Sequence, residues 1–301
     1  MRLRCDSRDT PVWRIRLEPG DSPGDSLRDS LGNSLGNSLG NSFGNSFGNK
    51  GEVVFDGPGL AQLDALLQAA EESRRCRILV VESMPGVFCR GMDLEFLVAH
   101  AGEDQSEKLA AYARCMERLR GSQKAVICLV DGDAVGGGVG LAAAADLVIA
   151  TSRARFALPE CVLGLIPAMV LPLLCERMPV QKARWLALSS RSIRADEAAS
   201  IGLVDELVEG PIQLEQSLRQ ILKRLLRASP NAVARLKRYS SEIATLNRAE
   251  ALELGAQRTA NDLIELETIA AIRGFMAGES PPWFERYRPT PGSGSGTGSG
   301  S

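Results

Sequence analysis

Apolar positions along the first 211 residues follow the two spacings that strands and helices require. Short apolar runs typical of strands cover residues 12–17, 53–55, 77–82, 125–130, 147–150, 155–157 and 204–208. Between them, apolar residues recur at helical spacing at 59–72, around 94–98, and at 107–119, 141–145, 181–189 and 195–200. Residues 86–93 predict a loop that leads into the second of these helices. Strands that alternate with helices predict an α/β core.

From about Ile212 onward the pattern is helical only. Leu214, Leu218 and Leu222 mark one helix, and Pro230 is placed to begin the next. Residues 250–276 have the pattern of one long amphipathic helix. The sequence therefore predicts an α/β core followed by a C-terminal helical region.

Two segments lack the composition of a packed core. Residues 19–50 contain a four-residue repeat, Ser-Leu-Gly-Asn and then Ser-Phe-Gly-Asn, which we interpret as a flexible surface insert. A partner-docking loop or a β-solenoid fragment is the alternative interpretation of this repeat. The predicted divisions are an N-terminal strand region at 1–18, the insert at 19–50, a core at 51–211, a helical region at 212–290 and a Gly/Ser tail at 291–301.

Composition narrows the class of protein. The chain has 301 residues, 44% of them hydrophobic, and a formal net charge of −2, which suits one ordinary domain with appendages or two small ones. This charge gives no indication of a nucleic-acid partner. No run of about 18 apolar residues exists, so no membrane span is expected. The N-terminus has basic residues but no apolar stretch behind them, and we expect a cytoplasmic protein without a secretory signal.

The cysteines and the histidine do not have the spacing of a metal site. The 7 cysteines include no Cys-x-x-Cys pair, and their odd number in apolar contexts predicts buried free thiols in a reducing cytoplasm. Cys89 and Cys161 flank the candidate site described below, where we expect small buried apolar residues. With 1 histidine and no clustered ligands, no metal is expected.

The most distinctive chemistry lies in residues 134–141, Ala-Val-Gly-Gly-Gly-Val-Gly-Leu. Three consecutive glycines before a helix leave backbone N–H groups uncovered at a point of partial positive charge, which suits a developing oxyanion. A helix-packing glycine is the alternative for Gly137. About twenty residues later, Glu160 follows Pro159 in apolar surroundings that would raise its pKa and favour proton transfer. A surface acid after a strand is the alternative for Glu160.

Four segments in this order resemble the crotonase superfamily, the enoyl-CoA hydratases and isomerases. They are residues 88–93 (Phe-Cys-Arg-Gly-Met-Asp), 131–138 (Asp-Gly-Asp-Ala-Val-Gly-Gly-Gly), 145–150 (Ala-Asp-Leu-Val-Ile-Ala) and 156–167 (Phe-Ala-Leu-Pro-Glu-Cys-Val-Leu-Gly-Leu-Ile-Pro). The resemblance covers roughly residues 51–280. It implies a crotonase-like spiral of ββα units with a C-terminal helical region, assembled into trimers or hexamers.

The resemblance also implies roles for individual residues. The backbone N–H groups of Met92 and Gly137 would form an oxyanion hole for a thioester carbonyl, and Glu160 would be the catalytic acid and base. The substrate would be carried on coenzyme A or on the phosphopantetheine of an acyl carrier protein, with no metal or redox cofactor. Residues expected to contact the substrate or its carrier are Arg90, Gly91, Asp93, Gly136, Gly138 and Gly140.

One departure from the family pattern narrows the choice of reaction mechanism. Typical hydratases have a second glutamate in the helix after the glycines, but here that position is Gly140. A mechanism with two carboxylates is therefore not expected, whereas a proton shift or a syn elimination with one carboxylate is compatible with Glu160.

Residues 138–141 (Gly-Val-Gly-Leu), 158–160 (Leu-Pro-Glu) and 165–172 (Leu-Ile-Pro-Ala-Met-Val-Leu-Pro) resemble one subgroup, the dehydratase of polyketide β-branching cassettes, which residues 88–93 also fit. This subgroup implies dehydration of 3-hydroxy-3-methylglutaryl-carrier protein to the 3-methylglutaconyl thioester. The alternatives are a Δ3,Δ2-enoyl-CoA isomerase, the 3-methylglutaconyl decarboxylase of the same fold, and a non-catalytic binding protein.

Four neighbouring side chains have ordinary structural interpretations. Asp93 is placed to cap the helix that begins near Leu94. Arg90 has two equal interpretations, a contact to a phosphate or carboxylate of the substrate and a solvated surface arginine. We expect His100 to be exposed without a role as a base, and Tyr112 to lie in the core rather than to reach the pocket.

Overall fold

The computed structural model describes residues 1–6, 8–20 and 53–288. The repeat insert, apart from its first two residues, and the Gly/Ser tail lie outside the described residues. The chain divides into two compact units, Met1–Leu218 and Arg219–Ser301, of which the first contains all of the strands described below.

A six-stranded sheet is the centre of the first unit, with the order β1-β2-β3-β5-β7-β10 among the described residues. Its strands are β1 (Arg2–Asp6), β2 (Val12–Glu18), β3 (Ile78–Ser83), β5 (Ala125–Val130), β7 (Leu147–Thr151) and β10 (Glu206–Val208). β1 pairs antiparallel with β2, and every other neighbouring pair is parallel. Of the two central strands, β5 is apolar throughout and β3 is apolar over its first four residues, which is typical of parallel strands covered on both faces.

A second sheet has the order β4-β6-β8-β9 and carries the glycine loops. Its strands are β4 (Gly86–Cys89), β6 (Gly132–Val135), β8 (Arg155–Ala157) and β9 (Ile193–Arg194). β4, β6 and β8 run parallel, so their carboxyl ends lie at one edge of the sheet. That edge is followed in the chain by Arg90, by Gly136 and by Leu158.

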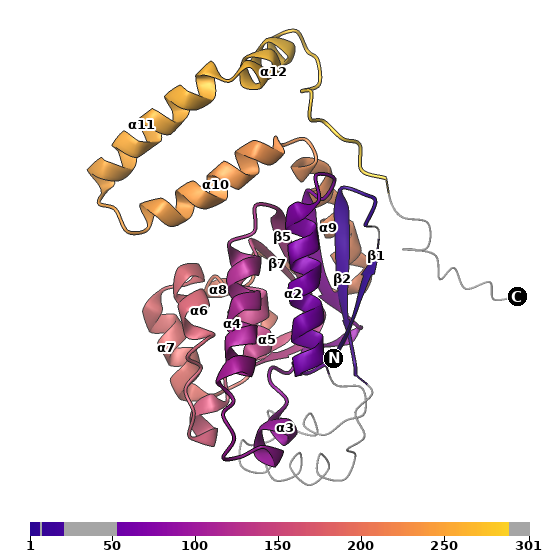
Figure 1. The fold of residues 1–301 in the computed structure, drawn as a ribbon, viewed down its shortest axis with the longest axis vertical. Coiled ribbons are helices and arrows are strands. Elements are labelled where there is room, and N and C mark those ends of the chain that lie inside the picture. The colour runs from indigo at the N-terminus through magenta and orange to yellow at the C-terminus, as the bar shows by residue number, and fades with distance from the viewer. Residues whose placement is uncertain (7, 21–52, 289–301) are drawn as a thin grey trace, which may run out of the picture. The chain divides into compact units, whose positions relative to one another are not determined.

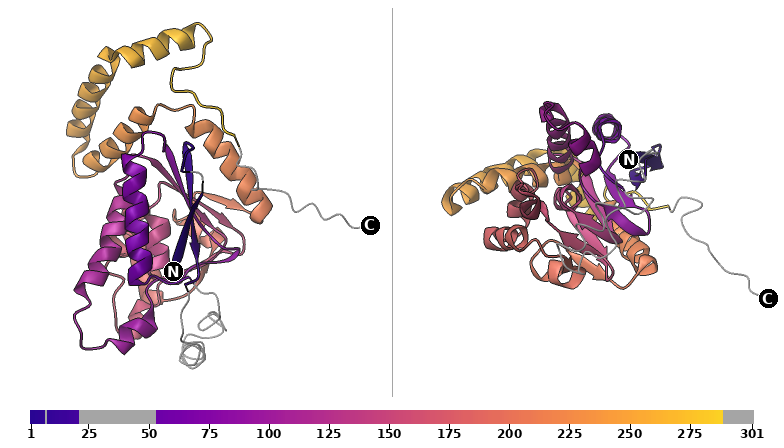
Figure 2. Two further views of the ribbon diagram at one scale, coloured as in Figure 1. Left: turned by 45° about the vertical axis from the view of Figure 1, so that its right-hand side comes forward. Right: turned by 90° about the horizontal axis from the view of Figure 1, so that it is seen from below.

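Helices connect the strands of the two sheets. They are α2 (Gly57–Glu72), α3 (Leu94–Ala99), α4 (Ser106–Arg120), α5 (Gly137–Ala143), the 3-10 turn η2 (Glu160–Leu163), α6 (Leu171–Arg177), α7 (Val180–Ser189) and α8 (Ala195–Ser200), followed by α9 (Pro211–Leu225). Asp56 begins α2 by accepting a hydrogen bond from the Gly59 amide at 2.7 Å. α2 and α4 lie side by side over the larger sheet (Figures 1 and 2).

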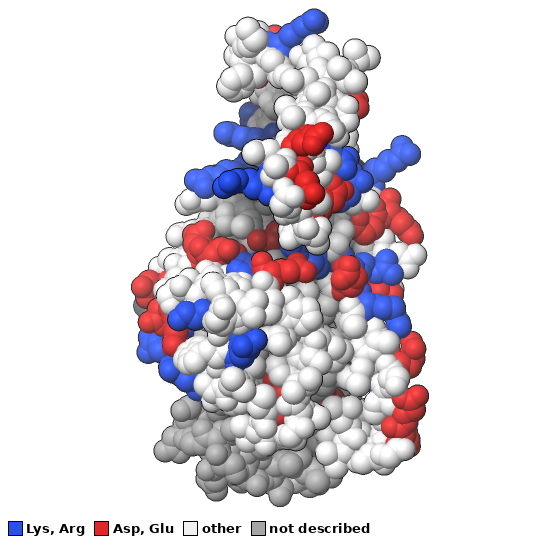
Figure 3. Space-filling model, turned by 90° about the vertical axis from the view of Figure 1, so that its left-hand side faces the viewer, with Lys and Arg blue, Asp and Glu red and all other residues white. Residues whose placement is uncertain are grey.

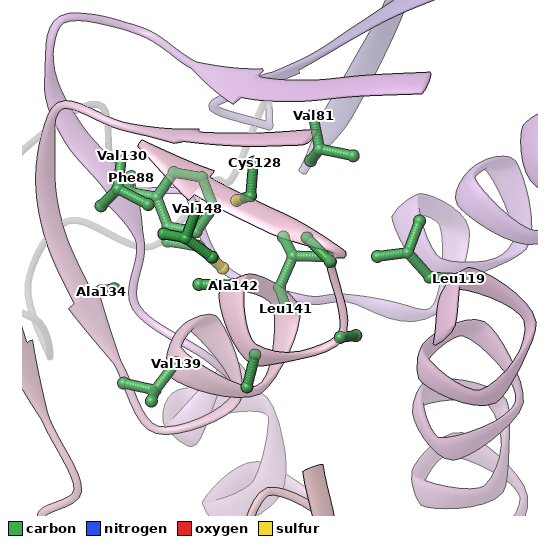
Figure 4. Close-up of a cluster of buried hydrophobic side chains, with 14 of the residues drawn as sticks. Val81, Phe88, Leu119, Cys128, Val130, Ala134, Val139, Leu141, Ala142 and Val148 are labelled. Atoms are coloured by element: carbon green, nitrogen blue, oxygen red, sulfur yellow. The ribbon is translucent and has the colours of Figure 1, made fainter. Parts of the chain in front are cut away.

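Helix α5 is the centre of the core. Each of its seven residues is buried, and small side chains allow it to lie close to its neighbours. Figure 4 shows Leu141 and Ala142 of this helix among Cys128, Val148 and Phe88, which come from β5, β7 and β4. Burial on every side fixes where the first turn of α5 lies, and that turn contains Gly137.

The second unit contains the last part of α9, from Arg219 onward, and three further helices among the described residues. These three are α10 (Pro230–Ile243), α11 (Arg248–Ile264) and α12 (Leu266–Met276). Ser229 caps α10, and Asn247 with Glu250 forms a capping box at the start of α11. The expectation of one long helix at 250–276 is wrong, because Glu265 has extended backbone angles and separates α11 from α12.

Other expected boundaries also need correction. Residues 86–93 are not all loop, because Gly86–Cys89 form β4, which parallel pairing with β6 stabilises. Residues 53–55 form no strand beyond a single bridge at Phe55. The helix expected at 141–145 begins at Gly137, since tertiary packing there outweighs the low helix propensity of glycine. The apolar pattern did not indicate β1, β9 or α6.

Gly132 offers a test of the close packing between β4 and β6. A methyl group at this position would overlap the backbone of Gly86 and Val87, neither of which is free to move as a side chain is. We expect Gly132→Ala to lower the free energy of unfolding by about 1–3 kcal/mol in urea titrations. Gly57→Ala is the matched control, because no atom lies within 4 Å of the added methyl group. Equal stability of the two variants would contradict the close packing of β4 against β6.

Candidate active site

The candidate site is built where three parallel strands end. β4 leads into Gly91 and Met92, β6 leads into the glycine run, and β8 leads through Pro159 into Glu160. Val135 pairs with Ala157, and the Gly136 amide donates to the Ala157 carbonyl at 2.9 Å. Segments that are far apart in the sequence are thereby held next to each other by backbone bonds.

The first loop turns at Gly91 and presents the amide of Met92. Gly91 has φ of +81°, a backbone conformation that favours glycine. Phe55 donates to the Gly91 carbonyl at 2.7 Å and accepts from the Asp93 amide at 3.2 Å. The Met92 N–H points away from Phe55, because successive amides of an extended segment alternate in direction. Within the described residues, no acceptor is found for it.

The second loop turns at Gly136 and begins helix α5. Gly136 has φ of +52° and ψ of −119°, and it is the N-cap residue of that helix. Gly137 is the first helical residue, so its N–H is among the amides that no carbonyl of the helix can satisfy. Among the described residues its N–H donates to no acceptor, and the helix terminus adds partial positive charge there.

The two loops touch at their glycines. A methyl group on Gly91 would lie 2.8 Å from the Gly137 nitrogen, and one on Gly137 would lie 3.4 Å from the Gly91 Cα atom. Side chains cannot be accommodated between these backbones. The contact therefore brings the Met92 loop and the Gly137 amide together, as a two-amide anion site requires.

Glu160 begins η2, next to the second loop. Its Oε1 atom lies 3.0 Å from the point that a methyl group on Gly136 would occupy. Its Oε2 atom is buried and has no hydrogen-bond partner among the described residues. Burial raises the pKa of this carboxyl above its ordinary value. A partly buried carboxyl with a raised pKa is suited to taking up and returning a proton.

The position opposite Gly140 is occupied by other groups. A methyl group there would overlap the Tyr112 hydroxyl and lie 3.2 Å from Cγ2 of Val170. Tyr112 and Val170 are both buried. The site therefore has no room for a second carboxylate at this position.

Tyr112 is a core residue, as expected, but its contacts with the site were not predicted. Its side chain is fully buried, and its hydroxyl donates to the Gly137 carbonyl at 2.8 Å. The helical spacing of Tyr112, Cys115, Met116 and Leu119 shows that they share the buried face of α4. This signal is visible in the sequence, whereas the identity of the element beneath that face is not.

The two charged residues of the first loop make structural contacts. The Asp93 side chain accepts from the Phe96 amide at 3.0 Å, which confirms the predicted cap of α3. Arg90 pairs with Asp133 at 3.2 Å and is 9% exposed, so it is not a solvated surface arginine. Contact of either residue with a substrate or its carrier stays a prediction.

Two expectations about other residues near the site are wrong. His100 is half-buried, because its ring stacks on Phe96 at a centroid distance of 3.9 Å. Cys161 is exposed, because η2 turns its side chain outward. Cys89 is buried as expected, and burial raises the pKa of its thiol to about 12, which leaves it unreactive at neutral pH.

Two cavities in the described residues lie away from the candidate site. One of 380 Å³ is bordered by Arg14, Glu82 and Glu215, where Arg14 pairs with both carboxylates at 2.5 and 3.1 Å. Another of 480 Å³ lies between α10 and α11. Neither includes Glu160, Met92 or Gly137 among its lining residues, so these cavities do not define the candidate site.

The part of the chain that the structure describes has neither a metal-binding cluster nor a helix that could span a membrane. No group of three or more His, Cys, Asp or Glu residues there is arranged to hold a metal ion. No helix among these residues combines the length and apolar character needed to cross a membrane.

Comparison with known proteins places the whole arrangement in context. The family model described as enoyl-CoA hydratase/isomerase matches residues 59–285. The chain is 31% identical to the bacillaene synthase dehydratase PksH of Bacillus subtilis over 190 residues, which are 62% of this chain and 72% of that protein. It is 30% identical to the carnitinyl-CoA dehydratase of Proteus mirabilis over 206 residues, which are 65% and 76% of the two chains.

Solved structures confirm the predicted crotonase-like α/β fold with C-terminal helices. An enoyl-CoA hydratase/isomerase from Marinobacter aquaeolei is 26% identical, with a TM-score of 0.75 over 94% of this chain and 99% of that one. AtuE of Pseudomonas aeruginosa is also 26% identical, with a TM-score of 0.76 and the same coverage of both chains.

The raised pKa of Glu160 predicts a pH-dependent stability. Burial favours the neutral carboxyl, so between pH 4.5 and the raised pKa the folded chain binds more protons than the unfolded chain, and stability falls as pH rises. We expect Glu160→Gln to have a higher Tm than the parent at about pH 8, with the difference vanishing below about pH 4. Thermal unfolding across this range measures the effect. The exposed Glu117→Gln is the control, and a lower Tm of Glu160→Gln at about pH 8 would contradict the prediction.

Proposed function

This chain belongs to the enoyl-CoA hydratase/isomerase family and is a hydro-lyase of that family, and from this premise we propose that it dehydrates 3-hydroxy-3-methylglutaryl-acyl carrier protein to the 3-methylglutaconyl thioester. The residues around Glu160 resemble the dehydratases of polyketide β-branching. PksH, a relative at 31% identity, carries the name bacillaene synthase dehydratase. Both observations support dehydration within the reactions that the fold performs.

In the proposed mechanism, the thioester carbonyl oxygen accepts hydrogen bonds from the Met92 and Gly137 amides. Both N–H groups are available, because neither has an acceptor among the described residues. Amides fixed in this way stabilise the negative charge that develops on the oxygen when C2 loses its proton. Loss of one such donor typically removes about 3 kcal/mol of transition-state stabilisation.

Glu160 carries out both proton transfers. Its carboxylate takes the proton from C2, and the C–H electron pair becomes part of the enolate. The enolate electrons then form the C2–C3 double bond as the C3–O bond breaks, and the same proton passes from Glu160 to the departing oxygen. Water leaves, and the carboxylate is regenerated. No metal or redox cofactor takes part in these steps.

One observation favours a reaction that uses a single carboxylate over one that uses two. The carboxylate beside the glycine loop is that of Glu160, and the space opposite Gly140 is filled by Tyr112 and Val170. Activation of water by two carboxylates has no place in this arrangement. A syn elimination needs one group that alternates between base and acid, and Glu160 meets that requirement.

The reaction is tested by incubating the full chain with 3-hydroxy-3-methylglutaryl-acyl carrier protein and following the acyl group by mass spectrometry. We expect loss of one water in the parent and at least about a hundredfold slower loss in Glu160→Gln. Glu117→Gln is the control and should react at the parental rate. No loss of water from the parent, or full activity in Glu160→Gln, would overturn the proposal.

The same assay separates the alternatives within the fold. Loss of carbon dioxide from the 3-methylglutaconyl thioester would identify a decarboxylase. Movement of the double bond in a 3-enoyl-CoA without a mass change would identify an isomerase. Parallel reactions with the coenzyme A thioester show which carrier is used.

We also propose that the chain assembles as a trimer or hexamer, which the family resemblance implies. Apolar side chains of η2, the loop after it and α7 are exposed, namely Val162, Leu163, Leu165, Ile166, Val180, Trp185 and Leu188. Helix α7 lies at the left of Figure 1 and therefore on the face that Figure 3 presents, where a broad area carries few charged side chains. A second copy of the chain would remove this surface from water.

Sedimentation equilibrium tests the assembly. We expect the parent to have three or six times the mass of one chain. Leu188, which is 70% exposed, is the position to change, and Leu188→Asp should lower the mass by placing a charge in the interface. Val98→Asp, at a 69% exposed position on α3, is the matched control and should leave the mass unchanged. A monomeric parent would contradict the proposal.

A further inference from the structure

We propose that Tyr112 is a positioning residue. It fixes the positions of the two glycine loops relative to each other, and it leaves no room for a second carboxylate at position 140. This inference rests on the proposed function, because it concerns the two amides and the acid assigned there. It adds a residue outside the four segments that carry the family resemblance.

Tyr112 is attached to the second loop by its hydroxyl and its ring. The hydroxyl donates to the Gly137 carbonyl at 2.8 Å. The ring lies beneath the same residue, since a methyl group on Gly137 would lie 3.2 Å from its Cε2 atom. A hydrogen bond and a van der Waals contact to one residue restrict both the position and the orientation of the first turn of α5.

Tyr112 is connected to the first loop through Phe55. The two rings meet edge to face with centroids 5.2 Å apart and planes at 65°. The Phe55 backbone holds Gly91 and Asp93 through two hydrogen bonds, and Met92 lies between them. One buried side chain therefore contacts the Gly137 loop directly and supports the Met92 loop through one intermediate residue.

The hydroxyl also occupies the space opposite Gly140. A methyl group there would overlap it, so any larger side chain at position 140 requires Tyr112 to move. Moving Tyr112 would break its bond to Gly137 and withdraw its ring from Phe55. The same side chain thus excludes a larger residue at position 140 and supports the placement of the two glycine loops.

Tyr112 does not itself exchange protons with the substrate. Burial raises the pKa of its hydroxyl well above the ordinary value, and the charge of the nearby Glu160 carboxylate raises it further. The hydroxyl stays neutral and remains a donor to Gly137 at every pH at which Glu160 titrates. Its effect on the reaction is exerted through the position of the loop.

The test uses Tyr112→Phe, which keeps the ring and removes the hydrogen bond. Polarisation of the carbonyl is read from the red shift in the ultraviolet band of a dienoyl-CoA thioester on binding, which does not require turnover. Dehydration kinetics are measured on the same proteins. Tyr239→Phe is the matched control, because the Tyr239 hydroxyl also donates to a backbone carbonyl, that of Ala251, at 2.8 Å in the second unit.

We expect Tyr112→Phe to show a smaller red shift and a kcat reduced roughly three- to tenfold, with KM changed less than about twofold. Its pH–rate profile should match that of the parent, because Glu160 keeps its surroundings. Tyr239→Phe should lower Tm by a similar amount and leave kcat and the red shift unchanged. A parental red shift and kcat in Tyr112→Phe would overturn the role of Tyr112. A red shift in the parent without dehydration would overturn the proposed reaction instead.

A double-variant cycle tests the steric part. Alanine is favoured over glycine within helices, so a loss of activity and Tm in Gly140→Ala would report the overlap with the Tyr112 hydroxyl. We expect that loss to be smaller when Gly140→Ala is introduced into Tyr112→Phe. Gly138→Ala is the control, because its methyl group overlaps the Cys89 carbonyl instead, and its effect should be the same in both backgrounds. Equal effects of Gly140→Ala in both backgrounds would overturn the steric claim.

Discussion

The contact between the backbones of Gly91 and Gly137 is the constraint on which the site depends. A methyl group on Gly91 would lie 2.8 Å from the Gly137 nitrogen, so any side chain there would push the two loops apart. The Met92 and Gly137 amides belong to these loops, and they have no acceptors among the described residues. In the proposed function these two amides bind the oxyanion, whose energy depends steeply on the positions of its donors.

The core is organised to maintain that contact. Helix α5 is buried on every side, so its first turn cannot shift without disturbing both sheets. Three parallel strands bring their carboxyl ends to one edge and place Met92, Gly137 and Glu160 near each other. Tyr112 fills the space beneath the glycine turn and opposite Gly140. The small residues that allow this close packing therefore also set the relative positions of Met92, Gly137 and Glu160.

Glu160 shows the opposition between stability and reactivity in this site. Burial raises its pKa, and its Oε2 atom has no hydrogen-bond partner among the described residues. Both features lower the stability of the folded chain when the carboxylate is charged. They also leave the group ready to accept a proton from a bound molecule. The core of α5 and the two sheets supplies the stability that allows such a residue to persist.

The sequence by itself determined the elements and chemistry that depend on local pattern. Apolar runs predicted β2, β3, β5 and β7, and Asp93 was correctly predicted to cap α3. Only the tertiary structure decided what depends on contacts between distant segments: that α5 begins at Gly137, that Tyr112 bonds to that residue, and that Cys161 is exposed. Periodicity shows which face of an element is buried, whereas the groups that meet that face are set by strand register and close packing over the whole chain.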